Sequence, residues 1–144
     1  MSQASDSVDT VGEGLEFDLG SEVHCVSIEY VTEVVDSEEM TTVPNTPAHV
    51  EGVMDLRGST TTIVDPKTLL DITEDGAGQR IIVFDTDIFT EEQSVGWVVD
   101  GVREVTNVSE DELDDSPVDD EYVEGFIARE SGFVVWVKPR DFHE

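Results

Sequence analysis

The chain has few basic residues and almost no cysteine, and each shortage excludes a class of protein. Lys and Arg together number 7 against 35 Asp and Glu, which gives a formal net charge of -28. Such an acidic surface repels nucleic acid, so a nucleic-acid partner is not expected. The single cysteine, Cys25, cannot form an internal disulfide and suits a reducing compartment. We expect Cys25 to be a small buried thiol rather than a nucleophile.

Long apolar runs are also missing. No stretch approaches the roughly 20 apolar residues that a membrane helix needs, and the first residues lack the basic and apolar regions of a signal peptide. We therefore expect a cytoplasmic protein without direct membrane insertion. Residues 1–13 are polar and are expected to be disordered.

Apolar residues are nevertheless plentiful. They make up 38% of the chain, and 23 of its 144 residues are valine, which argues against a disordered protein. The acidic residues are spread over almost every segment, whereas only two lysines are present, Lys67 and Lys138. This distribution favours adaptation to concentrated salt, as in halophilic, haloarchaeal-type proteins. The alternative is that the acidic residues form a specific binding surface.

The charge predicts that salt stabilises the fold. At about 1 M salt the Debye length is only about 3 Å, so repulsion among the carboxylates is largely screened. We expect the thermal midpoint of unfolding to rise between about 0.1 M and about 3 M salt. We also expect the fold to loosen in dilute buffer and to recover when salt is restored. A midpoint that is the same at both concentrations would contradict this prediction.

Short runs of β-branched and aromatic residues recur between turn residues, for example "EVHCVSI", "TTTIVD", "RIIVFD" and "GFVVWV". This pattern is typical of an all-β barrel or sandwich. Helices are few. "PKTLLDI" (66–72) is expected to form one turn, with Pro66 near its start, and "KPRDFHE" (138–144) another.

The sequence also repeats itself. "VSIEYVTEV" (26–34) aligns with "WVVDGVREV" (97–105) at an offset of 71, and "VEGVM" (50–54) aligns with "VEGFI" (123–127) at an offset of 73. The repeat predicts two packed five-stranded barrels, the first at about 14–71 and the second at about 79–141, joined by the polar segment 72–79. The aligned Gly52 and Gly125 are expected at bulges or close backbone contacts. A groove between the two barrels is a natural place for a partner to bind.

No motif for catalysis is present. His24, His49 and His143 lack metal-ligand spacing, and neither a nucleophile elbow nor a phosphate-binding loop occurs. We therefore expect no enzyme activity, no cofactor and no metal. The acidic run 110–122 lacks the order of ligands of an EF-hand and is interpreted as a solvated loop. The alternative function is that of a standalone acidic β-barrel protein that binds a divalent cation through 110–121 or a similar cluster.

Two successive valines point to a binding role. A strand with one face in solvent alternates apolar and polar residues, so Val98 and Val99 in succession indicate that both faces of their strand are covered. The cover is either the second barrel or an amphipathic helix from another protein.

Several segments of the chain, in their order and spacing, resemble those of the CheW family of chemotaxis coupling proteins. The resemblance runs from "LEFDLGSEVHCVSIEYVTEVV" through "VPNTPAHVEGVMDLRGSTTTIVD" and "VGWVVDGVREV" to "YVEGFIARESGFVVWV", which is nearly the whole chain after residue 14. It implies two tandem SH3-like barrels and a scaffold without catalysis. It also implies two partners, the CheW-like regulatory domain of the histidine kinase CheA and the cytoplasmic tip of chemoreceptors, and a location in chemoreceptor arrays.

The resemblance also implies a receptor site. In the family, the arginine of the "LRG" turn lies close to the glutamate near the start of the "EV" strand, so Arg57 is expected to pair with Glu33 at the rim of the groove. Gly58 would permit the turn that presents Arg57. A purely structural pair at this corner is the alternative. The expected receptor-binding groove consists of Val31, Glu33, Arg57, Gly58, Val99, Val102 and Val105.

Overall fold

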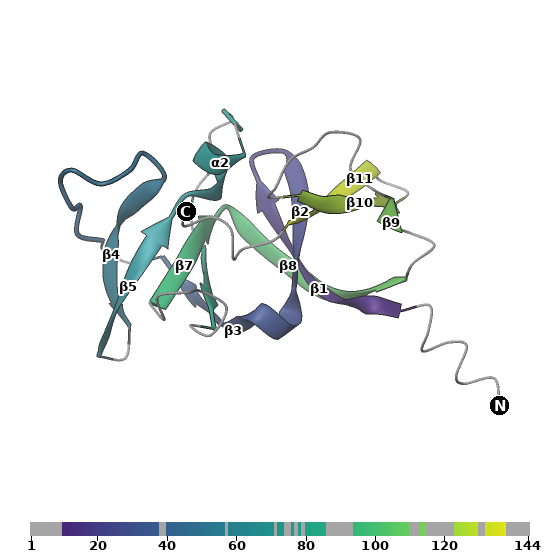
Figure 1. Cartoon of the computed structure of the whole chain (residues 1–144), viewed down its shortest axis with the longest axis horizontal. Helices are drawn as coiled ribbons and strands as arrows, with labels where there is room; N and C mark the ends of the chain where they lie inside the picture. Colours follow the sequence, from purple (N-terminus) through teal and green to yellow (C-terminus); the bar gives the residue numbers. More distant parts are fainter. Residues whose placement is uncertain are drawn as a thin grey trace.

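Strands make up nearly all of the regular structure (Figure 1). The computed structural model describes residues 10–37, 40–56, 58–70, 72–73, 76, 78, 80–85, 94–109, 113–114, 123–129 and 132–137. The strands are β1 Thr10–Leu19, β2 Glu22–Ser27, β3 Val31–Asp36, β4 Val50–Leu56, β5 Ser59–Val64, β6 Arg80–Phe84, β7 Ser94–Val99, β8 Gly101–Ser109, β9 Leu113–Asp114, β10 Val123–Arg129 and β11 Gly132–Val137. The short 3-10 helix η1 (Ile28–Tyr30) and the helix α2 (Pro66–Leu69) complete the described elements.

The strands form two sheets that pack against each other. Sheet A has the order β8-β1-β2-β11-β10-β9, in which β9 contributes only two residues, and sheet B has the order β3-β6-β7-β5-β4. The prediction of an all-β fold with two five-stranded units and few helices is confirmed, with β9 as an additional short strand of sheet A. In the described part of the chain, no helix is long and apolar enough to cross a membrane.

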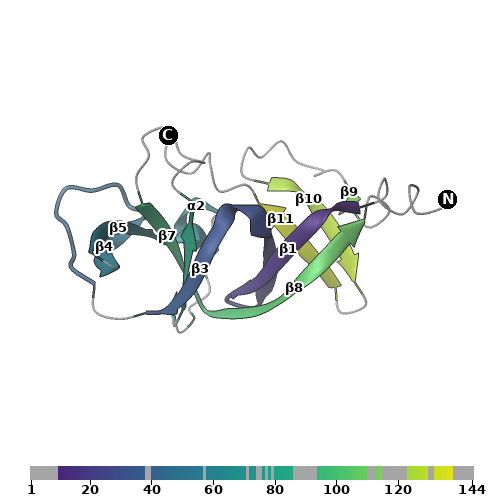
Figure 2. The same ribbon diagram turned by 90° about the horizontal axis from the view of Figure 1, so that it is seen from below.

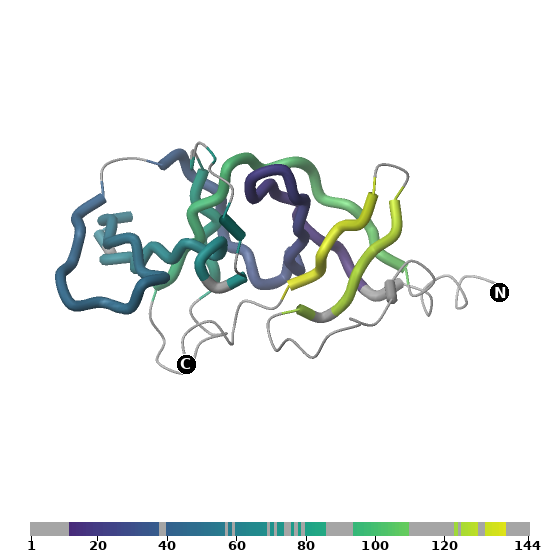
Figure 3. Tube along the Cα trace, turned by 90° about the horizontal axis from the view of Figure 1, so that it is seen from above, coloured from purple at the N-terminus to yellow at the C-terminus, as the bar shows by residue number. Residues whose placement is uncertain are grey.

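The predicted division of the chain into a first and a second half is wrong. Sheet B consists of the central residues 31–99, whereas sheet A combines the N-terminal β1 and β2 with β8 to β11. Figure 3 shows the C-terminal hairpin β10–β11 beside the N-terminal strands. The physical reason is the parallel ladder between β2 and β11, which has its equivalent in sheet B between β5 and β7. In the sequence, the segment 72–79 falls between β5 and β6, which both belong to sheet B.

The repeat found in the sequence corresponds to equivalent strands of the two sheets. In the order of the sheets, β3, β6, β7, β5 and β4 match β8, β1, β2, β11 and β10. Val31 of β3 pairs with Phe84, and its counterpart Val102 of β8 pairs with Phe17. The chain passes from sheet A to sheet B at η1 and returns at Asp100. The second unit is thus a circular permutation of the first.

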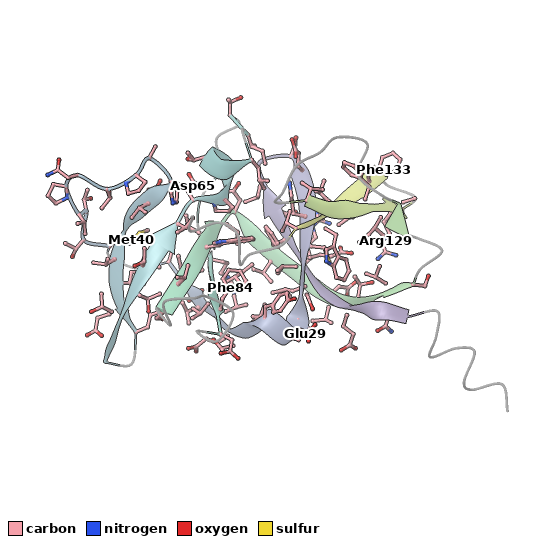
Figure 4. The ribbon with its side chains drawn as sticks, viewed as in Figure 1. Glu29, Met40, Asp65, Phe84, Arg129 and Phe133 are labelled. Carbon is pink, nitrogen blue, oxygen red and sulfur yellow. The ribbon has the colours of Figure 1, made fainter. Side chains whose placement is uncertain are left out.

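Three apolar clusters fill the fold. Two of them are formed by the strands of one sheet alone. The cluster of sheet A consists of Cys25, Val108, Ile127, Val134 and Trp136, and that of sheet B of Met54, Ile63, Ile81 and Val83. The largest lies between the sheets and takes residues from both: Leu15, Phe17, Leu19, Val26, Val64, Ile82, Phe84, Val95, Trp97, Val99 and Val137. We call this cluster the shared core. Phe84, labelled in Figure 4, is one of its buried members.

Strands with two buried faces explain the unbroken apolar runs in the sequence. In β6, Ile81 and Val83 face the cluster inside sheet B, whereas Ile82 and Phe84 face the shared core. Because each face of this part of the strand meets a core, residues 81–84 are all apolar, whereas Arg80 at the start of β6 is exposed. The cover over Val98 and Val99 is therefore intramolecular.

Register shifts occur beside the two aligned glycines. The β4–β5 ladder shifts between Val50 and Gly52, and the β10–β11 ladder shifts between Val123 and Gly125. At Gly52 the backbone is also approached closely, because an added Cβ would lie 2.5 Å from the carbonyl oxygen of Thr41. Only glycine fits there without displacing the backbone of the neighbouring segment.

The predictions for the helical turn at 66–72, the turn at 138–144 and the N-terminal residues have different outcomes. Helix α2 forms within 66–72: Pro66 is its first residue, and the Asp65 side chain accepts a hydrogen bond from the Lys67 N–H at 3.0 Å. The expected turn at 138–144 lies outside the described residues. The expected disorder of 1–13 is wrong for 10–13, because β1 begins at Thr10 and pairs with the long strand β8.

Candidate functional site

Strands β3 and β8 carry most of the predicted site. Both are terminal strands in the order of their sheets: β3 pairs only with β6, and β8 only with β1. Figure 2 shows both on the face of the molecule turned to the reader, together with β1. Edge strands of this kind leave backbone groups and side chains open to a partner.

Several apolar side chains of β3, β8 and the adjacent η1 rest on the shared core. Val31 and Val102 are partly buried and pack against it, as do Val34 and Tyr30. Val105, the counterpart of Val34 in the repeat, is 45% exposed. We call the partly exposed apolar residues along β3, η1 and β8 the seam: Ile28, Tyr30, Val31, Val34, Val102 and Val105.

The structure brings Val31 and Val102 into equivalent positions over one core, but it excludes Val99 from the seam. Val99 is fully buried in the shared core, so a partner cannot contact it without opening the fold. The prediction that Val99 lines the receptor-binding groove is wrong, because the neighbouring sheet covers its side chain. The apolar pattern of the sequence does not distinguish an intramolecular cover from a partner.

Two further residues of the predicted site, Glu33 and Gly58, also belong to the part of the chain that forms sheet B. Glu33 is a half-buried residue of β3. Gly58 occupies the turn between β4 and β5 with a φ of 83°, a left-handed conformation that favours glycine. Arg57 lies outside the described residues, so its pair with Glu33 stays a prediction.

The buried titratable groups of sheet A are poorly suited to chemistry. Burial, with a smaller contribution from Glu16 that outweighs Arg129, raises the pKa of the Cys25 thiol to about 12. Cys25 is therefore a protonated, fully buried thiol, as the sequence predicts. Burial lowers the pKa of His24 to about 4, which keeps the imidazole neutral.

Metal binding finds no support in the described part of the chain. No group of three or more His, Cys, Asp or Glu is arranged there to hold an ion. Most of the acidic run 110–122, the basis of the cation-binding alternative, lies outside the described residues.

A second polar site, which the sequence prediction missed, joins the two sheets. The carboxylate of Asp100 forms an ion pair with Lys67 at 2.8 Å, and both side chains are largely buried. The repeat aligns Asp100 with Glu29, and this alignment is the one signal that draws attention to the position. Nothing in the sequence relates Asp100 to Lys67.

Comparison with known proteins defines the family. The family model of the CheW-like domain matches residues 13–142. The chemotaxis protein CheW of Thermotoga maritima is 28% identical over 110 residues, which cover 76% of this chain and 71% of that protein. CheW of Klebsiella aerogenes is 30% identical over 115 residues, or 76% of this chain and 65% of that protein. The chain belongs to the CheW-like family.

A solved structure agrees with this assignment. The scaffolding protein TtCheW of Thermoanaerobacter tengcongensis matches with a TM-score of 0.78 and 28% identity, over 90% of each chain. At this coverage the likeness extends over the overall fold of the chain.

Proposed function

We propose that this chain couples chemoreceptors to the histidine kinase CheA and that the seam receives the helical tip of the receptor. The family and the fold make the chain a chemotaxis coupling adaptor. The observation that supports the site is the placement of Val31 and Val102 at equivalent positions over the shared core.

The seam has the chemistry of a helix-binding surface. Its residues are apolar and partly exposed, and they lie on η1 and on β3 and β8, the strands at the ends of the two sheet orders. An amphipathic helix binds such a surface by burying its apolar face. Val105 adds an exposed apolar contact farther along β8.

Charged residues at the rim complete the proposed site. As the resemblance to the family implies, Arg57, which lies outside the described residues, is proposed to pair with Glu33 of β3, with Gly58 in the turn that follows it. The chain has 7 basic residues against 35 acidic ones. An arginine can therefore form an ion pair with a carboxylate of the receptor, which few other positions of this chain can do.

Two substitutions test this site. Arg57→Glu reverses the charge at the rim, and Val105→Asp places a carboxylate on the exposed part of β8 without entering the core. We expect each to weaken binding of a receptor tip fragment about tenfold or more, which corresponds to about 1.4 kcal/mol. Binding of the CheA regulatory domain should be unchanged. Both affinities are measured separately with purified proteins at high salt.

Arg80→Glu is the matched control. Arg80 lies on β6 of the same sheet, is half exposed and approaches Asp36 of β3 at 3.5 Å, so its reversal changes the net charge by the same amount at a residue that is not part of the seam. If Arg57→Glu binds the receptor as tightly as Arg80→Glu does, Arg57 is peripheral. If the folded wild type binds neither partner, the proposed function is wrong.

A further inference from the structure

We propose that Asp100 is a positioning residue, whose contacts with Lys67, Gly20 and Gly78 clamp sheet A to sheet B and thereby set the geometry of the seam. The consequence for receptor binding rests on the proposed function; the clamp itself does not.

The carboxylate of Asp100 accepts three hydrogen bonds. The backbone N–H of Gly20 donates to Oδ2 at 2.6 Å, and that of Gly78 donates to Oδ1 at 2.8 Å. The ammonium group of Lys67 lies 2.8 Å from Oδ2. Gly76 packs directly on the carboxylate, because an added Cβ would overlap it. Both oxygens are therefore engaged, and the side chain has one possible orientation.

These donors come from both sheets. Gly20 lies in the turn between β1 and β2 of sheet A, 80 positions away in sequence. Lys67 lies on α2, which follows β5 of sheet B, and Gly78 precedes β6 of sheet B. Asp100 itself is the residue at which the chain returns from β7 to β8. A single carboxylate thus joins the turn of one sheet to two segments of the other.

Burial makes the clamp costly to break. The side chains of Lys67 and Asp100 are only 14% and 11% exposed. Partial burial alone would raise the pKa of Asp100, but the hydrogen bonds from Lys67, Gly20 and Gly78 outweigh burial and lower that pKa. If Asp100 is removed, the Lys67 ammonium loses its partner in a largely buried position, whereas without Lys67 the Asp100 carboxylate keeps only the two backbone N–H donors.

The other crossover between the sheets is built differently. Glu29, the counterpart of Asp100 in the repeat, is exposed, and among the described contacts its carboxylate accepts only a long bond from Ser27 Oγ at 3.3 Å. Figure 4 shows Glu29 at the opposite edge of the molecule from Asp65, which caps α2. The equivalent acidic position therefore lacks the clamp and provides a natural control.

The clamp is close to the seam in sequence and in structure. Asp100 also donates its backbone N–H to the carbonyl oxygen of Asp18 at 3.0 Å, and Arg103 binds the Asp18 carboxylate at 2.7 Å. These contacts fix the start of β8, where Val102 lies two residues after Asp100. A partner that contacts β3 and β8 together needs the two strands in one relative placement. If only a fraction of molecules has that placement, the apparent affinity falls by that fraction.

The first test measures the geometry directly. Asp100→Asn replaces one acceptor oxygen with an NH₂ group that must face an N–H donor. Spin labels on cysteines that replace Asp55 of β4 and Ala128 of β10, both exposed, report the distance between the sheets. The native Cys25 is fully buried and does not take the label. We expect a broader distance distribution in Asp100→Asn and the wild-type distribution in Glu29→Gln.

The second test measures receptor binding by the same variants. We expect the affinity of Asp100→Asn for the receptor tip to fall about tenfold, as when about a tenth of the molecules keep the competent placement. Lys67→Met keeps the Gly20 and Gly78 bonds and should show a smaller change of the same kind; it also replaces Asp100→Asn as the test if that variant does not fold.

The outcomes separate the clamp from the function. A narrow distribution in the folded variants overturns the inference, even if the wild type binds the receptor. A broad distribution with unchanged affinity overturns the role of the clamp in binding. If Asp100→Asn gives a broad distance distribution and the wild type does not bind the receptor, the clamp is supported and the proposed function is contradicted.

Discussion

Replacing Trp97 with alanine should lower the free energy of unfolding by about 3–5 kcal/mol. Trp97 is fully buried on β7 of sheet B and contacts Phe17 of sheet A at 5.9 Å between ring centroids. It also contacts Phe84 edge-on at 4.8 Å. The substitution therefore leaves a cavity in the core that the two sheets share, and it removes two aromatic contacts.

The measurement is denaturant unfolding at constant high salt, followed by probes in each sheet. Because the shared core joins the sheets, we expect both probes to report the same, lower midpoint. Phe133→Ala is the control, since Phe133 is 67% exposed and its loss should change stability by less than about 0.5 kcal/mol. Equal effects of the two substitutions would show that the shared core does not hold the sheets together.

Lowering the pH should destabilise the protein through a buried histidine, His24. His24 is 2% exposed, and burial lowers its pKa from 6.5 to about 4. Its Nδ1 has no hydrogen-bond partner in the described structure. Glu22 approaches Nε2 at 3.6 Å, but this carboxylate is half exposed and does not offset the burial. Between these pKa values the unfolded chain binds a proton that the folded chain does not.

Stability from His24 is therefore complete above pH 6.5 and is lost as the pH falls toward 4, by on the order of 3 kcal/mol. His24→Leu removes the titrating group. We expect the free energy of unfolding of the wild type to fall relative to that of His24→Leu across this range, with both proteins at the same high salt. The many carboxylates titrate in both proteins, so they cancel in the difference. Parallel pH profiles would contradict the assignment.

The fold class could be predicted from the sequence because it depends on local patterns. Runs such as "RIIVFD" specify strands through their β-branched residues, and the repeat indicates two similar units. The assignment of strands to sheets could not be predicted in the same way. The ladder between β2 and β11 joins the two ends of the chain, and parallel pairing leaves no turn signal in the sequence.

The site could be predicted in part, for a related reason. Val31 and Val102 stand out because the repeat aligns them, and both pack against the shared core from edge strands. Val99 shows the same apolar character but is covered by the neighbouring sheet. Asp100 was missed because its partners are distant in the chain, and nothing distinguishes one buried carboxylate among 35 acidic residues before the fold is known.

The circular permutation also suggests why an adaptor has this architecture. The chain crosses between the sheets twice, at η1 and at Asp100, and the two sheets share one apolar core. A scaffold that holds two partners needs a fixed relation between its surfaces. The shared core and the Asp100 clamp both contribute to that relation, one through apolar burial and the other through a buried ion pair.

The most direct test of the coupling function asks whether the chain bridges its two partners. Receptor tip fragments are sedimented at high salt with the CheA kinase, with and without this protein. The account predicts that CheA sediments with the receptor when the wild-type chain is present, and much less when Arg57→Glu replaces it. If the folded wild type leaves CheA in the supernatant, the chain does not couple these partners and the central claim is wrong.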